Sequence, residues 1–139
     1  ISYRNYKYFK TMLEILGKKD YAKAYVVWKN DIPLASALII FYQKEALYLY
    51  GGSSEKYRNL MAPYLLHWEI IKEAKERKCL EYNFLGIAPN DDQNHPWIGI
   101  TRFKKQFGGK QEDILGCFDL PVKPLEYQLF KIAEKIRRR

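Results

Sequence analysis

The sequence predicts an α/β protein in which helices pack on a mixed, mostly antiparallel β-sheet. Residues 22–51 contain three short runs rich in β-branched and aromatic residues, and turn residues separate them. From Pro63 onward, helix-like and strand-like patterns alternate. With 139 residues and 47% hydrophobic content, the chain is about one domain long and can bury one core. These observations together favour a sheet covered by helices.

A helix is expected over residues 3–16. Its apolar residues Tyr6, Phe9 and Leu16 follow the three-to-four-residue spacing of one helical face. Gly17 stands where a helix commonly ends. Arg4 and Tyr8 are four residues apart and are therefore neighbours on the surface of this helix.

Three antiparallel strands are expected next, over residues 22–28, 34–42 and 47–51. The turns between them, 29–33 and 43–46, are short and polar, which indicates a meander. Strict alternation in the third strand predicts that Tyr48 and Tyr50 share one face. Those two tyrosines either cover the sheet or line a pocket.

The second half of the chain is expected to alternate between helices and strands. A long helix carries Pro63 in its first turn and Leu66, Ile70 and Ala74 on its apolar face. The segments after it are predicted as a strand (80–87), a polar loop (88–96), a helix (97–107), a strand (114–120) and an amphipathic helix beginning at Pro124. The pattern gives no reason for a boundary inside the 139 residues, so a single domain is expected. His67 receives no role.

The helix over 97–107 contains the most unusual feature of the sequence. At about 100° per residue, one face of it is apolar and consists of Trp97, Ile100, Phe103 and Phe107. Lys104 falls inside this apolar face, whereas Arg102 and Lys105 point away from it. A lysine in such a position either extends along its own aliphatic chain to water or serves a site.

The net charge of the chain indicates which classes of binding partner suit it. The formal net charge is +8, and half of it comes from residues 131–139, which contain five basic residues and one acidic residue. Such a tail suits nucleic acid, phosphate groups or an acidic membrane surface, although a solvated terminus is equally consistent with charge alone.

The sequence contains no pattern typical of a cofactor site or of a membrane-spanning segment. Cys79 and Cys117 show no metal-binding or disulfide pattern, and His67 and His95 lack ligand spacing, so no metal and no cofactor are expected. No apolar run approaches the roughly 20 residues of a membrane span. Free cysteines without a signal peptide favour a reducing, cytoplasmic setting. Because the chain opens on Ile1, we expect it to be a piece of something longer.

The order of elements resembles the GNAT fold of N-acetyltransferases. Acetyl-CoA binding in that fold needs a glycine-rich turn at the start of the helix after the meander, where N–H groups hold the pyrophosphate. Residues 53–63 contain no glycine, and Glu55 would repel phosphate. The sequence therefore argues against acetyl-CoA as a donor.

Four motifs in order resemble the second, C-terminal GNAT-like domain of the FemABX peptidoglycan-bridge aminoacyltransferases. They are Tyr48-Leu-Tyr-Gly-Gly-Ser53, Ala62-Pro-Tyr-Leu-Leu-His-Trp68, Tyr82-Asn-Phe-Leu-Gly-Ile87 and Phe103-Lys-Lys-Gln-Phe-Gly-Gly109. The resemblance covers residues 22–122. Asn83 departs from it, because the family usually has aspartate there. Family enzymes pair two such domains, and the first, N-terminal one is missing here.

The resemblance implies transfer of glycine, alanine or serine from an aminoacyl-tRNA to the stem-peptide amine of a peptidoglycan precursor. The precursor would be lipid-linked or UDP-linked, and the enzyme would be cytoplasmic, at the inner face of the membrane. The basic tail would contact tRNA or anionic lipid. No enzyme nucleophile is needed for aminolysis of an activated ester, which agrees with the lack of a Ser/His or Cys/His pair.

The resemblance also implies roles for individual residues. Lys104 would stabilise the tetrahedral intermediate. Tyr48 and Tyr50 would line the precursor site, with Phe103 as a further substrate contact, and Arg4 with Tyr8 would lie near the precursor's diphosphate.

Two alternatives stay open. One is an acyl-CoA-dependent GNAT N-acyltransferase, and the other is a non-catalytic GNAT-like binding module.

Overall fold

The structure, a computed structural model, describes residues 4–89, 93–116 and 118–137. Two compact units make it up, Ile1–Phe107 and Gly108–Arg139. The first unit holds all strands of the sheet together with helices α1 (Tyr6–Leu16), α2 (Ala62–Glu76) and α3 (Ile98–Lys105). The predicted α/β class is confirmed.

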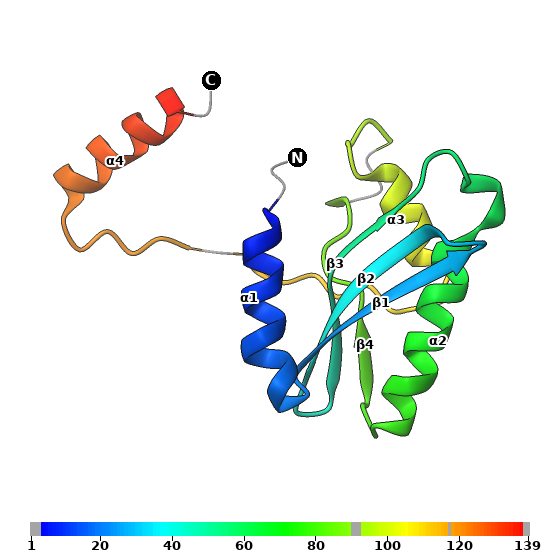
Figure 1. The fold of residues 1–139 in the computed structure, drawn as a ribbon. Coiled ribbons are helices and arrows are strands. Elements are labelled where there is room, and N and C mark those ends of the chain that lie inside the picture. The colour runs from blue at the N-terminus through cyan, green and yellow to red at the C-terminus, as the bar shows by residue number, and fades with distance from the viewer. Residues whose placement is uncertain (1–3, 90–92, 117, 138–139) are drawn as a thin grey trace. The chain divides into compact units, whose positions relative to one another are not determined.

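A four-stranded sheet forms the centre of the first unit (Figure 1). Strands β1 (Ala22–Lys29), β2 (Ile32–Tyr42) and β3 (Glu45–Ser53) form the expected antiparallel meander. The short strand β4 (Glu81–Asn83) pairs in parallel with β3. The sheet is therefore mixed and mostly antiparallel, as predicted.

Two-residue loops connect the meander strands. Between β1 and β2, Asn30 and Asp31 adopt φ angles of 46° and 62°. Asparagine and aspartate tolerate this left-handed conformation, which lets the chain reverse tightly without splaying the strands. Both strands consequently extend closer to the turn than the sequence pattern predicts.

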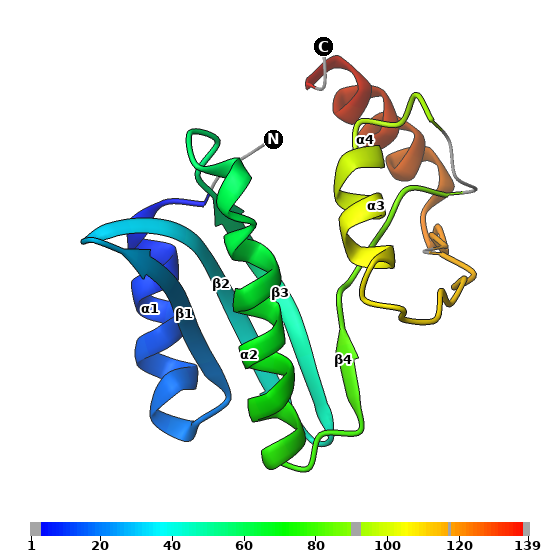
Figure 2. The same ribbon diagram turned by 90° about the vertical axis from the view of Figure 1, so that its right-hand side faces the viewer.

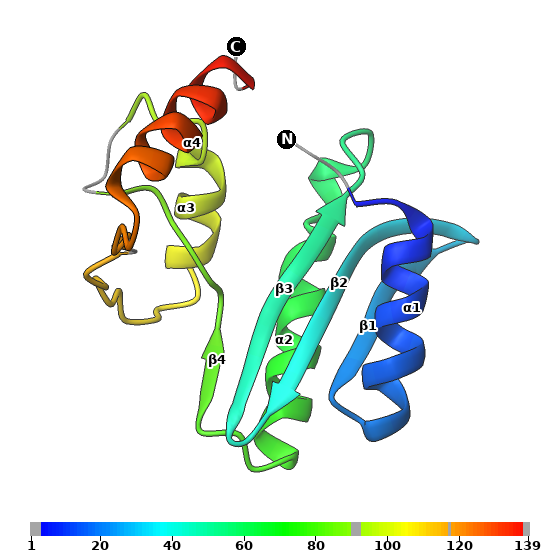
Figure 3. The same cartoon turned by 90° about the vertical axis from the view of Figure 1, so that its left-hand side faces the viewer.

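Helices α1 and α2 cover opposite faces of the sheet (Figures 2 and 3). The α2 face contains most of the core, because Ile39 of β2 and Ile70 of α2 are fully buried there. Around this pair lies one hydrophobic cluster, formed by Leu34, Ala35, Ala37, Phe41, Ala46, Ala62, Leu66 and Ala74. Helix α1 begins after Asn5, whose side chain accepts a hydrogen bond from the Tyr8 N–H at 2.9 Å.

A β-bulge in β3 changes which residues share a face. Tyr48 pairs with Ile39 and Tyr50 pairs with Leu38, so Leu49 has no partner on β2. Neighbours in β2 point to opposite faces, and directly paired residues share a face. Tyr48 therefore faces α2 and Tyr50 faces α1. The prediction that both tyrosines share one face is wrong, because the inserted residue breaks the alternation.

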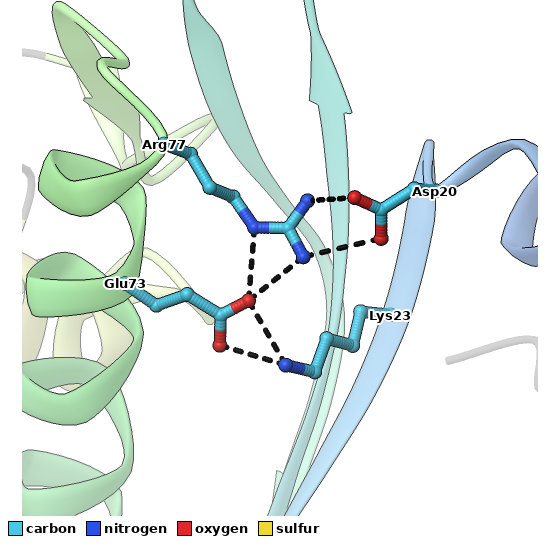
Figure 4. A network of polar contacts seen from close by, with 4 residues as sticks. All are labelled: Asp20, Lys23, Glu73 and Arg77. Atoms are coloured by element: carbon cyan, nitrogen blue, oxygen red, sulfur yellow. Dashed lines mark hydrogen bonds and ion pairs between the residues drawn. The ribbon is translucent and has the colours of Figure 1, made fainter.

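An ion-pair network joins the C-terminal end of α2 to the start of β1 (Figure 4). The Arg77 guanidinium donates to both carboxylate oxygens of Asp20, at 2.7 and 3.1 Å, and also contacts Glu73. Glu73 in turn accepts from the Lys23 ammonium at 2.8 and 2.9 Å. Two-point contacts of this kind fix the direction of the helix along the sheet edge.

Strand β4 is shorter than the predicted strand 80–87. The Asn83 side chain accepts a hydrogen bond from the Leu85 N–H at 2.7 Å, and Leu85 has a left-handed φ of 59°. This local turn competes with strand pairing and ends β4. The chain then separates from β3 and leads into the loop before α3 (Figure 2).

The second unit contains α4 (Pro124–Arg137), which begins at the predicted proline. The predicted strand over 114–120 is wrong for the residues described there, since 114–116 and 118–120 have no regular structure; residue 117 lies outside the described chain. Gly116 has a φ of +87°, which interrupts an extended backbone. Within the described chain, no helix is both long and apolar enough to cross a membrane.

Candidate active site

Helix α3 turns a different face inward from the one its apolar pattern predicts. Its buried residues are Thr101 and Lys104, whereas Ile100 is 42% exposed and Trp97 is 50% exposed. Phe103 is half-buried beside them. The inward position of Lys104 is as expected, but the aromatic ring beside its ammonium, that of Tyr48, comes from β3.

The ammonium of Lys104 lies inside the protein. The residue is only 8% exposed, and its Nζ donates a hydrogen bond to the Gly86 carbonyl at 2.6 Å. The same nitrogen lies 6.0 Å from the centre of the Tyr48 ring. Among the described residues, no carboxylate forms an ion pair with it. Burial lowers the pKa of Lys104 from its ordinary value.

The carbonyl that receives Lys104 is held by a second hydrogen bond between the same two segments. The Ala88 N–H donates to Oγ1 of Thr101 at 2.8 Å, and both residues are 1% exposed. One α3 side chain thus anchors the loop after β4, and the next turn of α3 supplies the lysine. This arrangement keeps the Gly86 carbonyl facing Lys104.

His67, for which no functional role is expected from sequence patterns, is buried beside Lys104. It is 1% exposed, and its Nδ1 lies 2.7 Å from the Tyr82 hydroxyl. Burial, together with the Lys104 charge, lowers its pKa to about 4, so the ring is neutral at neutral pH. Its spacing from Ile70 and Ala74 places it on the buried side of α2, and this spacing is the one signal the sequence contains.

Aromatic rings enclose this histidine. In the described part of the chain, five rings lie against it, those of Tyr48, Tyr82, Phe84, Phe103 and Phe107. Tyr48 is nearest, edge-on at 4.5 Å between ring centres. Tyr64 extends the group by stacking on Phe107 and donating a hydrogen bond to Gln106. We call these rings together with Lys104 and His67 the lysine cluster.

A second group of predicted site residues lies on the α1 face. The Arg4 guanidinium is 5.5 Å from the Tyr8 ring, and the Tyr8 and Tyr50 hydroxyl oxygens are 3.2 Å apart. Phe9 packs edge-on against Tyr50 at 5.2 Å. The hydrogen bond between the Tyr8 and Tyr50 hydroxyls raises the pKa of Tyr8 and lowers that of Tyr50. We call Arg4, Tyr8, Phe9 and Tyr50 the arginine cluster.

The structure therefore divides the six predicted site residues into two sets of three. Lys104, Tyr48 and Phe103 belong to the lysine cluster, and the other three belong to the arginine cluster. Across the described residues, no group of three or more histidine, cysteine or acidic side chains is placed to hold a metal ion.

The lysine cluster can oppose a developing negative charge. The Lys104 ammonium is buried and therefore poorly solvated, so its interaction with an anion is much stronger than it would be in water. The ammonium has three N–H donors, and Gly86 uses one of them. The others are available to an oxygen atom that becomes negative during a reaction.

The fold is that of GNAT-like acyltransferases. An aminoglycoside N-acetyltransferase, AAC(6')-Iy, solved in complex with CoA, superposes with a TM-score of 0.52 over 83% of this chain and 91% of that chain. The two are 10% identical, so this likeness concerns the fold alone. The crystal structure of FemX gives a TM-score of 0.63 with 28% identity, over 88% of this chain and 29% of FemX.

The chain belongs to the FemAB family, whose model matches residues 18–135. Aminoacyltransferase FemB of Staphylococcus epidermidis is 33% identical over 125 residues, which are 88% of this chain and 30% of the relative. Aminoacyltransferase FemA of the same organism is 27% identical over 109 residues, covering 78% and 26%. The family resemblance of the sequence is confirmed, and the chain spans less than a third of these relatives.

Proposed function

We propose that this chain is the C-terminal GNAT-like domain of a two-domain aminoacyltransferase. The enzyme would move glycine, alanine or serine from aminoacyl-tRNA to the stem-peptide amine of a peptidoglycan precursor. Family membership and the aminoacyltransferase relatives support this activity. The observation that carries it is the buried Lys104 ammonium, held by the Gly86 carbonyl beside the Tyr48 ring.

Lys104 would act on the charge that forms during aminolysis. The precursor amine attacks the ester carbonyl, a new C–N bond forms, and the carbonyl oxygen becomes negative. The ester C–O bond then breaks, the tRNA hydroxyl leaves with a proton, and the amide remains. A preorganised ammonium lowers the energy of the oxyanion without reorganising water.

The two clusters would contact different parts of an extended precursor. Tyr48 and Phe103 lie beside Lys104 and would contact the portion near the reacting amine. Arg4, Tyr8 and Tyr50 are more exposed and would meet the diphosphate, to which a guanidinium and hydroxyl groups are suited. No cofactor takes part in this proposal.

The proposed substrates determine where in the cell the enzyme would work. It would work in the cytoplasm, at the inner face of the membrane where lipid-linked precursors lie. The basic residues of α4, which include Lys131, Lys135 and Arg137, suit the tRNA backbone or anionic lipid headgroups.

Incubation of the full-length protein with charged tRNAs and precursors tests the proposal. Glycyl-, alanyl- and seryl-tRNA would each be offered with a lipid-linked and a nucleotide-linked precursor, and the products weighed by mass spectrometry. We expect the mass of one or more aminoacyl groups to be added. If none of the tRNA–precursor pairs yields a product, the proposal is contradicted.

An acyl-CoA-dependent N-acyltransferase is the alternative activity, because an acetyltransferase solved with CoA has the same fold. A calorimetric titration with acetyl-CoA separates the two. We expect no binding, because residues 53–63 lack a glycine turn and include Glu55. Saturable binding with acetyl transfer to an amine would support the alternative.

A further inference from the structure

Gly51 is a position where a side chain cannot fit. A Cβ added there would lie 2.1 Å from the Tyr48 hydroxyl oxygen and 2.6 and 2.7 Å from two carbons of the same ring. Contacts below 3.0 Å essentially never occur for a real Cβ. The backbone of Gly51 does not need glycine's conformational freedom, since in the described chain only Gly108 and Gly116 among the glycines have positive φ. Glycine is needed at position 51 because the Tyr48 ring occupies the space that a side chain would take.

The β-bulge brings the two residues to the same face. Gly51 pairs with Ala37 and Tyr48 pairs with Ile39, and these two positions of β2 face α2. The Tyr48 ring lies along β3 over Gly51. In a regular strand with Leu49 paired, Tyr48 and Gly51 are three positions apart and would point to opposite faces.

The ring has little freedom to move away from a new side chain. The His67 ring packs edge-on against it at 4.5 Å, and Phe84 lies at 6.4 Å between ring centres. Both neighbours are themselves held in the lysine cluster. A methyl group at position 51 would therefore displace the ring and not merely tilt it.

We propose that Gly51 is a positioning residue, which leaves the space that holds the Tyr48 ring against His67 and beside the Lys104 ammonium. The proposal rests on the transfer activity proposed above. In this proposal the face of the Tyr48 ring aligns the Lys104 ammonium. Gly51 sets the position of that ring, although it touches neither the ammonium nor the substrate. Small displacements of such groups reduce rates strongly.

Gly52 supplies a matched control. It is the next residue of the same strand, and a Cβ there meets no heavy atom within 4 Å. Gly51→Ala and Gly52→Ala therefore make the same chemical change in adjacent positions, and only the first produces a clash. Any general effect of adding a methyl group to β3 appears in both.

A kinetic double-mutant cycle tests the proposal in the full-length enzyme. We expect Gly51→Ala to lower kcat/KM by about 10- to 100-fold and Gly52→Ala to change it by less than about twofold. In a Tyr48→Leu background, where the ring is absent, Gly51→Ala should have no further effect. An equal loss in that background, or no loss in the wild type, would overturn the proposal.

An NMR measurement tests the same geometry without substrate. Cross-relaxation between the Tyr48 and His67 rings, assigned with Tyr48→Phe, should be present in the wild type and in Gly52→Ala and lost in Gly51→Ala. Persistence in Gly51→Ala refutes the positioning role even if the enzyme is active. Loss of the signal alongside an inactive wild type would leave the positioning intact and refute the proposed function instead.

The remaining possible outcome is that the Gly51→Ala variant does not fold. Should Gly51→Ala alone fail to fold, the double variant Gly51→Ala/Tyr48→Leu should fold, because it relieves the clash. A double variant that also fails to fold would show that position 51 acts through something other than Tyr48, and would overturn the proposal.

Discussion

The lysine cluster and the arginine cluster lie on opposite faces of one sheet and hold their cations differently. Lys104 is 8% exposed and bonded to a backbone carbonyl, whereas Arg4 is exposed and lies over the Tyr8 ring. Tyr8 itself is 40% exposed. Both clusters combine a cation with tyrosine, but only one of them excludes water.

This difference separates two kinds of function. A desolvated charge interacts strongly and is costly to keep, so it suits a single atom that becomes charged for a moment. A solvated guanidinium beside exposed phenols interacts weakly with any one group and suits a ligand already charged in water. Substitutions in the two clusters test this contrast, and the largest effect is expected at Lys104.

Lys104→Ala should lower the rate of aminoacyl transfer by roughly 10²–10³-fold, because it removes a preorganised charge. The melting temperature should change little, since the loss of a poorly solvated charge offsets the loss of packing. Steady-state kinetics and thermal unfolding measure the two. Lys105→Ala, on the exposed side of α3, is the matched control and should remain active. Full activity of Lys104→Ala would remove the distinction between the clusters.

Acid should destabilise the lysine cluster through His67. Its pKa is about 4 in the folded protein and 6.5 ordinarily, so between these values the unfolded chain binds the proton and the folded one does not. The free energy of unfolding should therefore be highest above pH 6.5 and should fall by roughly 2 kcal/mol as the pH drops to 5. Urea unfolding measures it, and His67→Gln should flatten this part of the profile. An unchanged slope in His67→Gln would contradict the assignment.

Thr101→Val should destabilise the protein by about 1–2 kcal/mol. It removes the acceptor of the buried Ala88 N–H, which is then left without a partner. Thr101→Ser keeps the hydroxyl and should lose less. Chemical denaturation compares the two, and equal losses would show that packing, not the hydrogen bond, holds the loop.

Tyr50→Phe should cost less than about 0.5 kcal/mol, because the hydrogen bond to Tyr8 is solvent-exposed and water replaces it. The same measurement on Tyr48→Phe provides the comparison on the buried face. A loss above 1 kcal/mol for Tyr50→Phe would mean that the arginine cluster is more rigid than its exposure indicates.

The sequence predicted the elements that depend on local patterns. The meander, the long helix with Pro63, and the helix beginning at Pro124 are present because turn residues and apolar spacing act within a few residues of chain. The strand over 114–120 failed because strand formation depends on a partner, which no local pattern reports, and because Gly116 adopts a positive φ.

The site was predictable only in part for a similar reason. Lys104 is conspicuous as a charge in an apolar stripe. His67 is conspicuous only once the burial of its helix face is known. The separation of Tyr48 from Tyr50 depends on register, and register is set by the pairing with β2. The roles of the six residues stay predictions.

The unpaired residue Leu49 makes β3 sensitive to length rather than to composition. Deleting Leu49 would make Tyr48 and Tyr50 neighbours in a regular strand, and neighbours in a strand also point to opposite faces, so each phenol would stay on its own side of the sheet. Inserting one further residue that pairs with β2 would instead turn one of the two phenols toward the other helix. This place in β3 should therefore tolerate the loss of its extra residue better than the gain of a second one.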